Sequence, residues 1–470
     1  MRVVLKPYPA YRVSGLAWLD EVPAHWTLTP NRALMRKRKV LVGEHHSEHQ
    51  LLSLTKAGII VRDIDSGKGK FSADMGTCQE VRCGNLVFCL FDVPETPRTV
   101  GLSPHVGMIT GAYTVFECSD PALSAYLHLF YRVMDDRKLL SPLYSGLRNT
   151  IPPTRLLSIK TPVPSTDEQH AIVRYVDYVE RRVRQCLREK QKLIKLLEEQ
   201  KQVATHRAVT RGLDPSAPLK FSGIPWLGEI PQHWEVRRIK YLLREVDERS
   251  TTGAEPLLSM RRQHGLVLFA EHFRRPPQAS TLVGFKIVRP GQFVVNRMQA
   301  GNGLIFASTL TGLVSPDYAV FDPIGDANVD FLGELFRSRK VRATFRAESK
   351  GLGTGSSGFL RLYNDRLGAI HVALPPSEEQ CEIVAAISGE LSGANLTIAR
   401  LERENELLRE YRTRIVADVV TGKLDVREAV ANLPDEADEL ELDDGEDGCV
   451  DGAETDGIGD SEAALEGVEA

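Results

Sequence analysis

Apolar residues recur at alternating spacings of four and three in two long stretches of the chain. This heptad spacing places one apolar stripe along an α-helix, and charged residues flank both stripes. The pattern therefore predicts two long helical segments, at residues 165–213 and 376–426, that pair through their stripes. The stripe positions are Ile172, Val176, Val179, Val183, Cys186, Lys190, Leu193, Leu197, Gln200 and Ala204, and then Ile387, Leu391, Ala394, Ile398, Leu401, Asn405, Leu408, Arg412, Ile415 and Val419.

Each predicted helix starts with residues that suit a helix N-terminus. Ser165 or Thr166 precedes two carboxylates in the first segment, and Ser377 precedes two in the second. A hydroxyl can accept hydrogen bonds from the free backbone N–H groups, and carboxylates favour the positive end of the helix dipole. We therefore expect these residues to cap the two helices.

The residues before each helical segment follow a different pattern. Short runs rich in β-branched and aromatic residues, such as residues 81–91, are punctuated by Gly, Pro and Asn. Helical stretches intervene at residues 122–136 and 330–345. The sequence thus predicts two domains of mixed helix and strand (α+β), at residues 1–164 and 214–375.

The two domains are copies of each other. SGLAWLDEVPAHW at residues 14–26 matches SGIPWLGEIPQHW at residues 222–234 at eight of thirteen positions, and these segments hold all four tryptophans. Further matches follow at an offset of roughly 205–212 residues and include both ends of the helical segments. The chain is therefore a covalent pseudo-dimer, which suits a target with two halves and predicts an antiparallel helix pair.

The net charge of -4 conceals an uneven distribution of charge along the 470 residues. Residues 434–470 contain 16 Asp or Glu and no Lys or Arg, so we expect a disordered acidic tail. The rest of the chain has 59 basic against 47 acidic residues. This basic body predicts a polyanionic partner, of which nucleic acid is the commonest.

Cysteine usage and hydropathy indicate the compartment. No apolar run is long enough for a transmembrane helix or a secretory signal. The seven cysteines favour reduced thiols and a cytoplasmic location. Cys78, Cys83, Cys89 and Cys118 cluster around His105, but their spacings are wider than the CxxC pairs of zinc sites. We expect buried structural thiols and no metal.

Catalytic motifs are sparse. The chain has no GxxxxGK[ST] phosphate loop, no HExxH and no Asp/Asn-Pro-Pro-aromatic methyltransferase signature. A degenerate nuclease pattern consists of Asp317, Glu348 and Lys350, in which the carboxylates would bind Mg²⁺ and the lysine would activate water. His25 and His233 stand in matched His-Trp pairs, where packing beside the tryptophan explains them more simply than catalysis.

Basic clusters and polar residues near Gly-rich turns provide candidate DNA contacts. Lys and Arg neutralise phosphates, Arg pairs with guanine, and Asn or Gln pairs with adenine. The predicted DNA-binding residues are Lys68, Lys70, Arg148, Asn149, Arg261, Arg262, Asn296, Arg297, Gln299, Asn302, Lys350 and Arg361. We expect the Gly-rich segment at residues 351–358 to be a flexible loop near the nucleic acid.

Three motifs resemble the specificity subunit of type I restriction-modification systems: SGxxWLxExPxHW, the Pro-Ser…Glu-Gln helix start and the Val-Thr…Leu-Asp helix exit. NRMQAGNGLI at residues 296–305 and GLVSPDYAVF at residues 312–321 resemble that family's recognition domains, and the likeness covers residues 8–430. The resemblance implies two target-recognition domains held apart by an antiparallel coiled coil. Each would read one half of an asymmetric, interrupted double-stranded DNA site, and the coiled-coil length would set the gap.

The resemblance also implies that the chain is not an enzyme and binds no cofactor itself. Two adenine-N6 methyltransferase subunits would join it, flip the target base and use S-adenosylmethionine. Motor-nuclease subunits would add cleavage driven by ATP and Mg²⁺. The lack of phosphate-loop and methyltransferase signatures agrees with this division of labour.

Two other functions fit parts of the pattern. A stand-alone Mg²⁺-dependent nuclease would use Asp317, Glu348 and Lys350, and DNA cutting that is lost in Asp317→Ala would favour it. A scaffold that does not bind DNA would join two protein-binding domains through the coiled coil, with the acidic tail recruiting a basic partner. Function that is insensitive to salt would favour the scaffold.

Overall fold

A computed structural model describes residues 5–434, apart from residues 17, 63–74, 97, 263, 274–275, 278 and 353–358. The described chain forms two compact units. Unit 1 contains the residues up to Lys190 and those from Arg403 onward, and unit 2 contains Gln191–Glu402. The chain therefore starts in unit 1, passes through unit 2 and returns to unit 1.

The core of unit 1 surrounds a four-stranded antiparallel sheet. Its strands pair in the order β4 (Met35–Arg38), β11 (Thr114–Cys118), β8 (Leu86–Phe88) and β9 (Val100–Leu102). Side chains alternate between the two faces of a strand, and here both faces are buried. Phe88 and Phe116 pack with helix α2 (Pro121–Asp136), whereas Val87 and Val115 belong to a second apolar cluster.

Shorter elements complete unit 1. They are the strand pairs β1 (Tyr11–Leu16) with β2 (Leu19–Pro23), β3 (Thr27–Pro30) with β12 (Lys160–Val163), β5 (Leu52–Thr55) with β6 (Gly58–Val61) and β7 (Gln79–Val81) with β10 (Gly107–Ile109), and the helices α1 (Asn31–Leu34), α3 (Pro153–Ser158) and α10 (Arg427–Val430).

Unit 2 repeats this topology. Its central sheet pairs β16 (Leu243–Val246), β23 (Ala319–Pro323), β20 (Phe293–Val295) and β21 (Ile305–Ala307) in the equivalent order. The turns before β8 and β20 also match, because Gly84 and Gly291 have φ angles of 81° and 83° that favour glycine. The predicted tandem repeat of two α+β domains is confirmed.

Most of the remaining elements of unit 2 correspond to those of unit 1, but α7 (Arg339–Glu348) has no α-helical counterpart in residues 137–143. The remaining elements are β13 (Leu219–Phe221) with β14 (Glu229–Pro231), β15 (Glu235–Arg238) with β26 (His371–Leu374), β17 (Leu258–Arg261) with β18 (Gly265–Leu268), β19 (Lys286–Val288) with β22 (Gly312–Val314) and β24 (Lys350–Leu352) with β25 (Phe359–Arg361), and the helices α5 (Phe269–His272), α6 (Val329–Arg337), α7 and α8 (Asn364–Ala369).

The helical stretch predicted at residues 330–345 is present but is divided into two helices, α6 and α7. Ser338 between them has an extended backbone, with φ of -61° and ψ of 147°. Phe331 in α6 and Phe345 in α7 are both buried in one core, so the break turns both helices onto it. In unit 1, the corresponding residues 137–143 form no α-helix.

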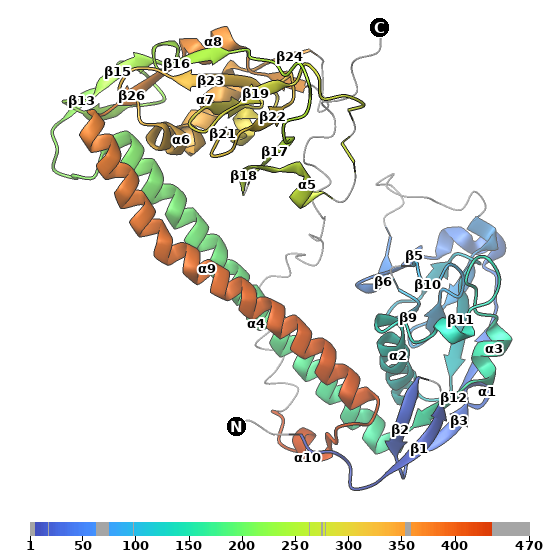
Figure 1. Cartoon of the computed structure of the whole chain (residues 1–470). Coiled ribbons are helices and arrows are strands. Elements are labelled where there is room, and N and C mark those ends of the chain that lie inside the picture. The colour runs from blue at the N-terminus through green and yellow to red at the C-terminus, as the bar shows by residue number, and fades with distance from the viewer. Residues whose placement is uncertain are drawn as a thin grey trace. The chain divides into compact units, whose positions relative to one another are not determined.

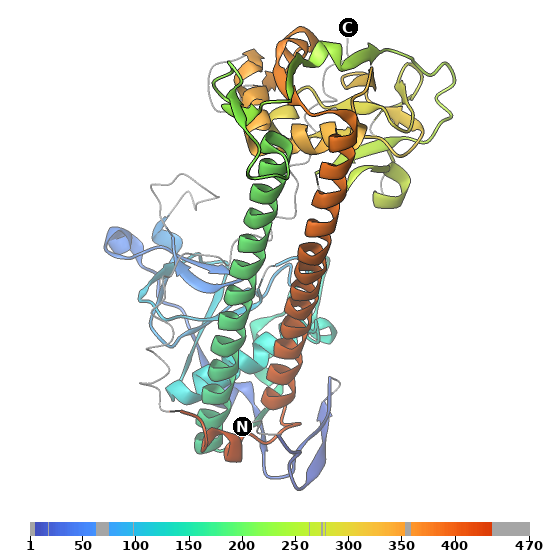
Figure 2. The ribbon, with the colours of Figure 1, turned by 90° about the vertical axis from the view of Figure 1, so that its left-hand side faces the viewer.

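Two long helices, α4 (Thr166–Arg211) and α9 (Ser377–Val420), lie side by side and antiparallel within each unit (Figures 1 and 2). In unit 1, Val176 of α4 shares a core with Val416 of α9, and in unit 2, Ala208 shares a core with Ile387. The predicted antiparallel pairing is confirmed. Both helices are shorter than the predicted 165–213 and 376–426, and α9 ends six residues early.

The apolar stripe of α4 departs from the predicted heptads in its second half. Leu193 is 44% exposed, whereas the neighbouring Ile194 is half-buried. An α-helix has about 3.6 residues per turn, so a strict repeat of 3.5 drifts around its surface. At Leu193 the buried position therefore shifts to the next residue, whereas the predicted Leu197 and Ala204 remain half-buried. Arg412 of α9 is likewise exposed and does not lie in the seam.

The chain after α9 folds back onto the first domain. Gly422 turns the backbone with a φ of 79°, and the Asp425 N–H donates to the Lys6 carbonyl at 2.8 Å. Val426 and Ala429 are buried in the core of unit 1. The first domain thus includes residues from beyond the second helix, in addition to the predicted 1–164.

Two sequence predictions concern residues outside the described part of the chain. They are the acidic tail beyond residue 434 and most of the Gly-rich segment at residues 351–358. Among the helices that the structure describes, none combines the length and the hydrophobicity needed to cross a bilayer.

Gly422→Ala should destabilise unit 1 by about 2–4 kcal/mol. An alanine Cβ would lie 2.5 Å from Pro23 Cδ and 2.9 Å from a ring carbon of Trp26, at a φ that disfavours side chains. Gly15→Ala is the matched control, because Gly15 has a φ of 68° but nothing lies within 4 Å of its Cβ position. Urea denaturation should show the larger loss for Gly422→Ala, and equal losses would contradict the packing described here.

Asn405→Leu should stabilise the helix pair by roughly 1 kcal/mol. Asn405 is 4% exposed, and its Oδ1 has no hydrogen-bond partner among the described residues. Leucine would remove that unsatisfied acceptor, whereas Asn405→Asp would bury a charge and lower the melting temperature. Thermal melts of the three proteins test this order. A lower melting temperature for Asn405→Leu would indicate that the amide is needed for register.

Candidate nucleic-acid interface

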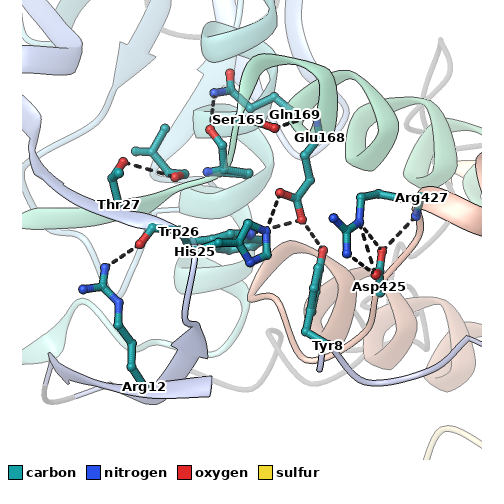
Figure 3. Close-up of polar contacts among 12 residues, drawn as sticks. Tyr8, Arg12, His25, Trp26, Thr27, Ser165, Glu168, Gln169, Asp425 and Arg427 are labelled. Carbon is teal, nitrogen blue, oxygen red and sulfur yellow. Dashed lines mark hydrogen bonds and ion pairs between the residues drawn. The ribbon is translucent and has the colours of Figure 1, made fainter. Parts of the chain in front are cut away.

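A buried carboxylate joins the first domain to the start of its long helix (Figure 3). Glu168 accepts hydrogen bonds from the Tyr8 hydroxyl at 2.6 Å and from Trp26 Nε1 at 3.1 Å, and its other oxygen lies 2.9 Å from His25 Nε2. The Glu168 side chain is only 2% exposed. Burial and the Glu168 carboxylate raise the pKa of the Tyr8 hydroxyl.

The start of α4 is capped as predicted. The Glu168 backbone N–H donates to Ser165 Oγ at 3.4 Å, and the helix begins at the next residue, Thr166. This places the Glu168 carboxylate in the first turn, where the helix dipole favours negative charge. The second helix differs, because Ser377 is itself the first helical residue.

The same joint recurs in unit 2. Glu379 accepts from Trp234 Nε1 at 3.1 Å and lies 2.7 Å from His233 Nε2. Trp26 and Trp234 are buried in the cores of their units. His25 and His233 are about half-exposed and bind the carboxylate beside the tryptophan, so the predicted structural role of the His-Trp pairs is confirmed.

Two loops of unit 1 meet beyond the end of β8. Backbone hydrogen bonds join the β8–β9 connection to the turn at residues 145–150, from Asp92 N to Arg148 O (2.9 Å) and from Ile151 N to Leu90 O (2.8 Å). The Arg148 guanidinium also lies 2.5 Å from the Asp92 carboxylate, and this hydrogen bond raises the pKa of Arg148. Arg148 and Asn149 are exposed at the tip of the turn.

The equivalent two loops meet in unit 2. The Leu362 N–H at the end of the β24–β25 hairpin donates to the Arg297 carbonyl at 2.8 Å. Arg297 follows β20 by two residues, as Leu90 follows β8, and Leu362 precedes α8 by two residues, as Ile151 precedes α3. Each unit therefore presents the same pair of loops on the same edge of its domain.

Arginines of the unit 2 loops pack around Asp317. Arg297 Nε donates to the Asp317 carbonyl at 2.8 Å, and the Arg361 guanidinium lies 3.7 Å from the Asp317 carboxylate. Burial and the charge of Arg361 lower the pKa of Arg297. The exposed Lys350 lies opposite Arg361 in the β24–β25 pair.

Polar residues of the turn after β20 are partly used in holding its shape. Asn296 is 2% exposed and accepts a hydrogen bond from the Met298 N–H, so its burial removes it from our candidate DNA contacts. Gln299 and Asn302 are half-buried, and the Asn302 amide donates to Gln299 Oε1 at 3.1 Å.

The structure brings together five of the predicted residues on one surface of unit 2. They are Arg297, Gln299, Asn302, Lys350 and Arg361. Arg261 and Arg262 lie at the β17–β18 turn, where the Arg261 guanidinium is 4.7 Å from the centre of the Phe273 ring and Arg262 is exposed. Lys68 and Lys70 lie outside the described residues.

Sequence reasoning placed two arginines of this surface in basic clusters but did not select them as DNA contacts. Arg346 of α7 donates to Asn302 Oδ1 at 3.0 Å, and Arg342 precedes it by one helical turn. The four-residue spacing of Arg342 and Arg346 could have identified them as candidates, because it places both side chains on one face of a helix.

The rival chemistries find little support in the geometry. Asp317 lies beside Arg361, and the Glu348 carboxylate lies 3.6 Å from Arg366. No group of three or more His, Cys, Asp or Glu in the described ranges is placed to hold a metal. Cys78 and Cys89 are buried, but Cys83 is exposed, so the prediction of buried thiols is wrong for Cys83. Burial raises the pKa of the Cys89 thiol to about 11.

A solved structure shares this fold. A chain from a structure of complex assembly and conformational transition in the type I R-M system has 15% identity and a TM-score of 0.62, with 86% of this chain and 99% of that chain covered. The HsdS subunit from Thermoanaerobacter tengcongensis has 16% identity, 86% and 98% coverage and a TM-score of 0.46. A type I S subunit from M. genitalium has 12% identity, 84% and 96% coverage and a TM-score of 0.33. No protein-family model and no curated protein matches the chain.

Glu168→Ala should lower the free energy of unfolding by about 3–5 kcal/mol, because it leaves buried donors of Tyr8 and Trp26 without an acceptor. Glu379→Ala is the matched variant and should cost less, since the Glu379 side chain is 23% exposed and water can replace it. Denaturation followed by tryptophan fluorescence tests this difference. Equal losses would show that burial does not set the strength of the two joints.

Proposed function

We propose that this chain is the DNA-specificity subunit of a type I restriction-modification system. It reads a bipartite, asymmetric site in double-stranded DNA and performs no chemistry itself. The observation that carries the proposal is the fold likeness to a structure of the type I R-M system over 86% of this chain, at a TM-score of 0.62. The motifs that the two repeats share support the same assignment.

The duplicated loops support recognition of two half-sites. In unit 1, a loop follows β8 and a turn precedes α3. In unit 2, a loop follows β20 and the β24–β25 hairpin precedes α8. Backbone hydrogen bonds join the two segments within each unit. The side chains on these loops differ between the units, so each can read a different half-site. Arginine and lysine supply phosphate contacts, and Asn149, Gln299 and Asn302 offer amide groups for base edges.

Partner subunits supply the catalysis in this proposal. Two adenine-N6 methyltransferase subunits bind S-adenosylmethionine and modify one adenine in each half-site, and motor-nuclease subunits use ATP and Mg²⁺ for cleavage. The assembly acts in the cytoplasm, where its thiols stay reduced. Neither rival has a specific observation in its favour.

Deleting the gene from its native host should abolish N6-methyladenine at one interrupted DNA motif. Single-molecule sequencing of genomic DNA with and without the gene measures this directly, and reintroducing the gene is the control. Unchanged methylation, in a host whose companion methyltransferase gene is expressed, would contradict the proposal. The lost motif would also give the target sequence.

Exchange of one domain separates the two half-sites. Replacing residues 8–160 with the first domain of another specificity subunit should change one half of the methylated motif and leave the other intact. A change in both halves would contradict independent reading by the two units.

A further inference from the structure

Two arginines of unit 2 pack against the glycine turn that follows β20, and a third lies near one of them. Arg342 and Arg346 come from α7, and Arg262 comes from the β17–β18 turn. Burial lowers the pKa of the Arg342 guanidinium, and the nearby positive charges of Arg262 and Arg346 lower it further. The fold therefore holds three like charges near one another, which is unfavourable unless an anion joins them.

Glycine allows this close approach. A Cβ on Gly303 would lie 3.1 Å from Arg342 Nε, and a Cβ on Gly301 would lie 3.0 Å from Arg346 Cβ. Gly303 also has a φ of 84°, which few other residues adopt. The turn and α7 are thus packed so that the two arginines are held at a fixed place on the surface.

Several other arginines of unit 2 have an acidic partner, and these three do not. Arg244 pairs with Asp322, Arg289 with Glu248 and Arg337 with Glu334. Within the part of the chain that the structure describes, no carboxylate lies within 4.0 Å of Arg262, Arg342 or Arg346. The acidic residues of this unit therefore leave the cluster uncompensated.

One donor of the cluster is buried without an acceptor. Arg342 Nε has no hydrogen-bond partner among the described residues, although it is shielded from solvent. A buried donor left unpaired is unfavourable, and a bound acceptor would satisfy it. Guanidinium groups match the geometry of phosphate oxygens, so a phosphate satisfies both the charge and the missing hydrogen bonds.

We propose that Arg262, Arg342 and Arg346 form a clamp for a backbone phosphate of double-stranded DNA. The clamp rests on the proposed function and deepens it, because it fixes the register of the unit 2 loops on the duplex without reading sequence. Unit 1 lacks an equivalent of α7 in residues 137–143, so the clamp belongs to one half-site. In unit 1, Arg148 of the turn at residues 145–150 is instead neutralised by Asp92.

The test measures binding of the full-length chain to a random-sequence DNA duplex of about 30 base pairs as salt rises from about 50 to 200 mM. Arg262→Gln and Arg346→Gln each remove one unpaired charge, and Arg289→Gln removes a charge that is paired with Glu248. All three change the net charge equally, so Arg289→Gln is the matched control. Melting temperatures check that each variant is folded.

The clamp predicts that each cluster variant binds several-fold more weakly at the lower salt concentration. The slope of log affinity against log salt should fall in magnitude by about 0.9 for each lost contact, equally for unrelated sequences, while Arg289→Gln leaves the slope unchanged. If Arg262→Gln and Arg346→Gln behave like Arg289→Gln while the unmodified chain binds DNA, the clamp is wrong and the proposed function stands. If the unmodified chain does not bind duplex DNA, both are overturned.

Discussion

The buried carboxylate in the first turn of each long helix is the contact that joins an α+β domain to its helix. Glu168 and Glu379 sit where the helix dipole favours negative charge, and each binds the His-Trp pair that closes the first hairpin of its domain. Because the tryptophan lies in the core of the domain, its indole N–H ties that core to the helix. A domain held in this way can present its loops at a defined angle to the helix that carries it.

The two joints are chemically alike but unequal in burial. Glu168 receives a third hydrogen bond, from Tyr8, and the chain after α9 closes over it through Asp425 and Arg427 (Figure 3). Tyr8 precedes the first repeat, and Asp425 follows the second helix. Residues from both ends of the described chain therefore complete the first domain. In the second domain, the single connection between α4 and β13 takes their place.

Much of this architecture could be predicted from the sequence, because the repeat and the helix seams are local patterns. The partner of the His-Trp pairs could not, since Glu168 is 142 residues from Trp26 and no local pattern links them. The drift of the α4 seam depends on which helix face its neighbour covers. The break at Ser338 depends on Phe331 and Phe345 packing into one core. Tertiary packing, which the local sequence does not show, decides both the seam and the break.

Candidate DNA contacts were harder to predict, because side-chain chemistry does not indicate exposure. Asn296 has an amide side chain that suits a base edge, but that side chain accepts a hydrogen bond within its own turn. Arg148 is paired with Asp92. Arg342 and Arg346 became candidates only when the structure showed them without carboxylates. The arginine of the unit 1 turn is therefore neutralised, whereas Arg342 and Arg346 of α7, beside the unit 2 loops, are not, as expected if two halves of one chain meet different half-sites.

Selection of bound sequences from a randomised DNA library tests the central claim most directly. The full-length chain, with the subunits that copurify with it, would be used to enrich duplexes, which are then sequenced. Recognition by two units predicts two short conserved blocks of different sequence, separated by a gap of constant length and variable sequence. A single continuous block, or no enrichment despite measurable DNA binding, would contradict recognition by two independent units.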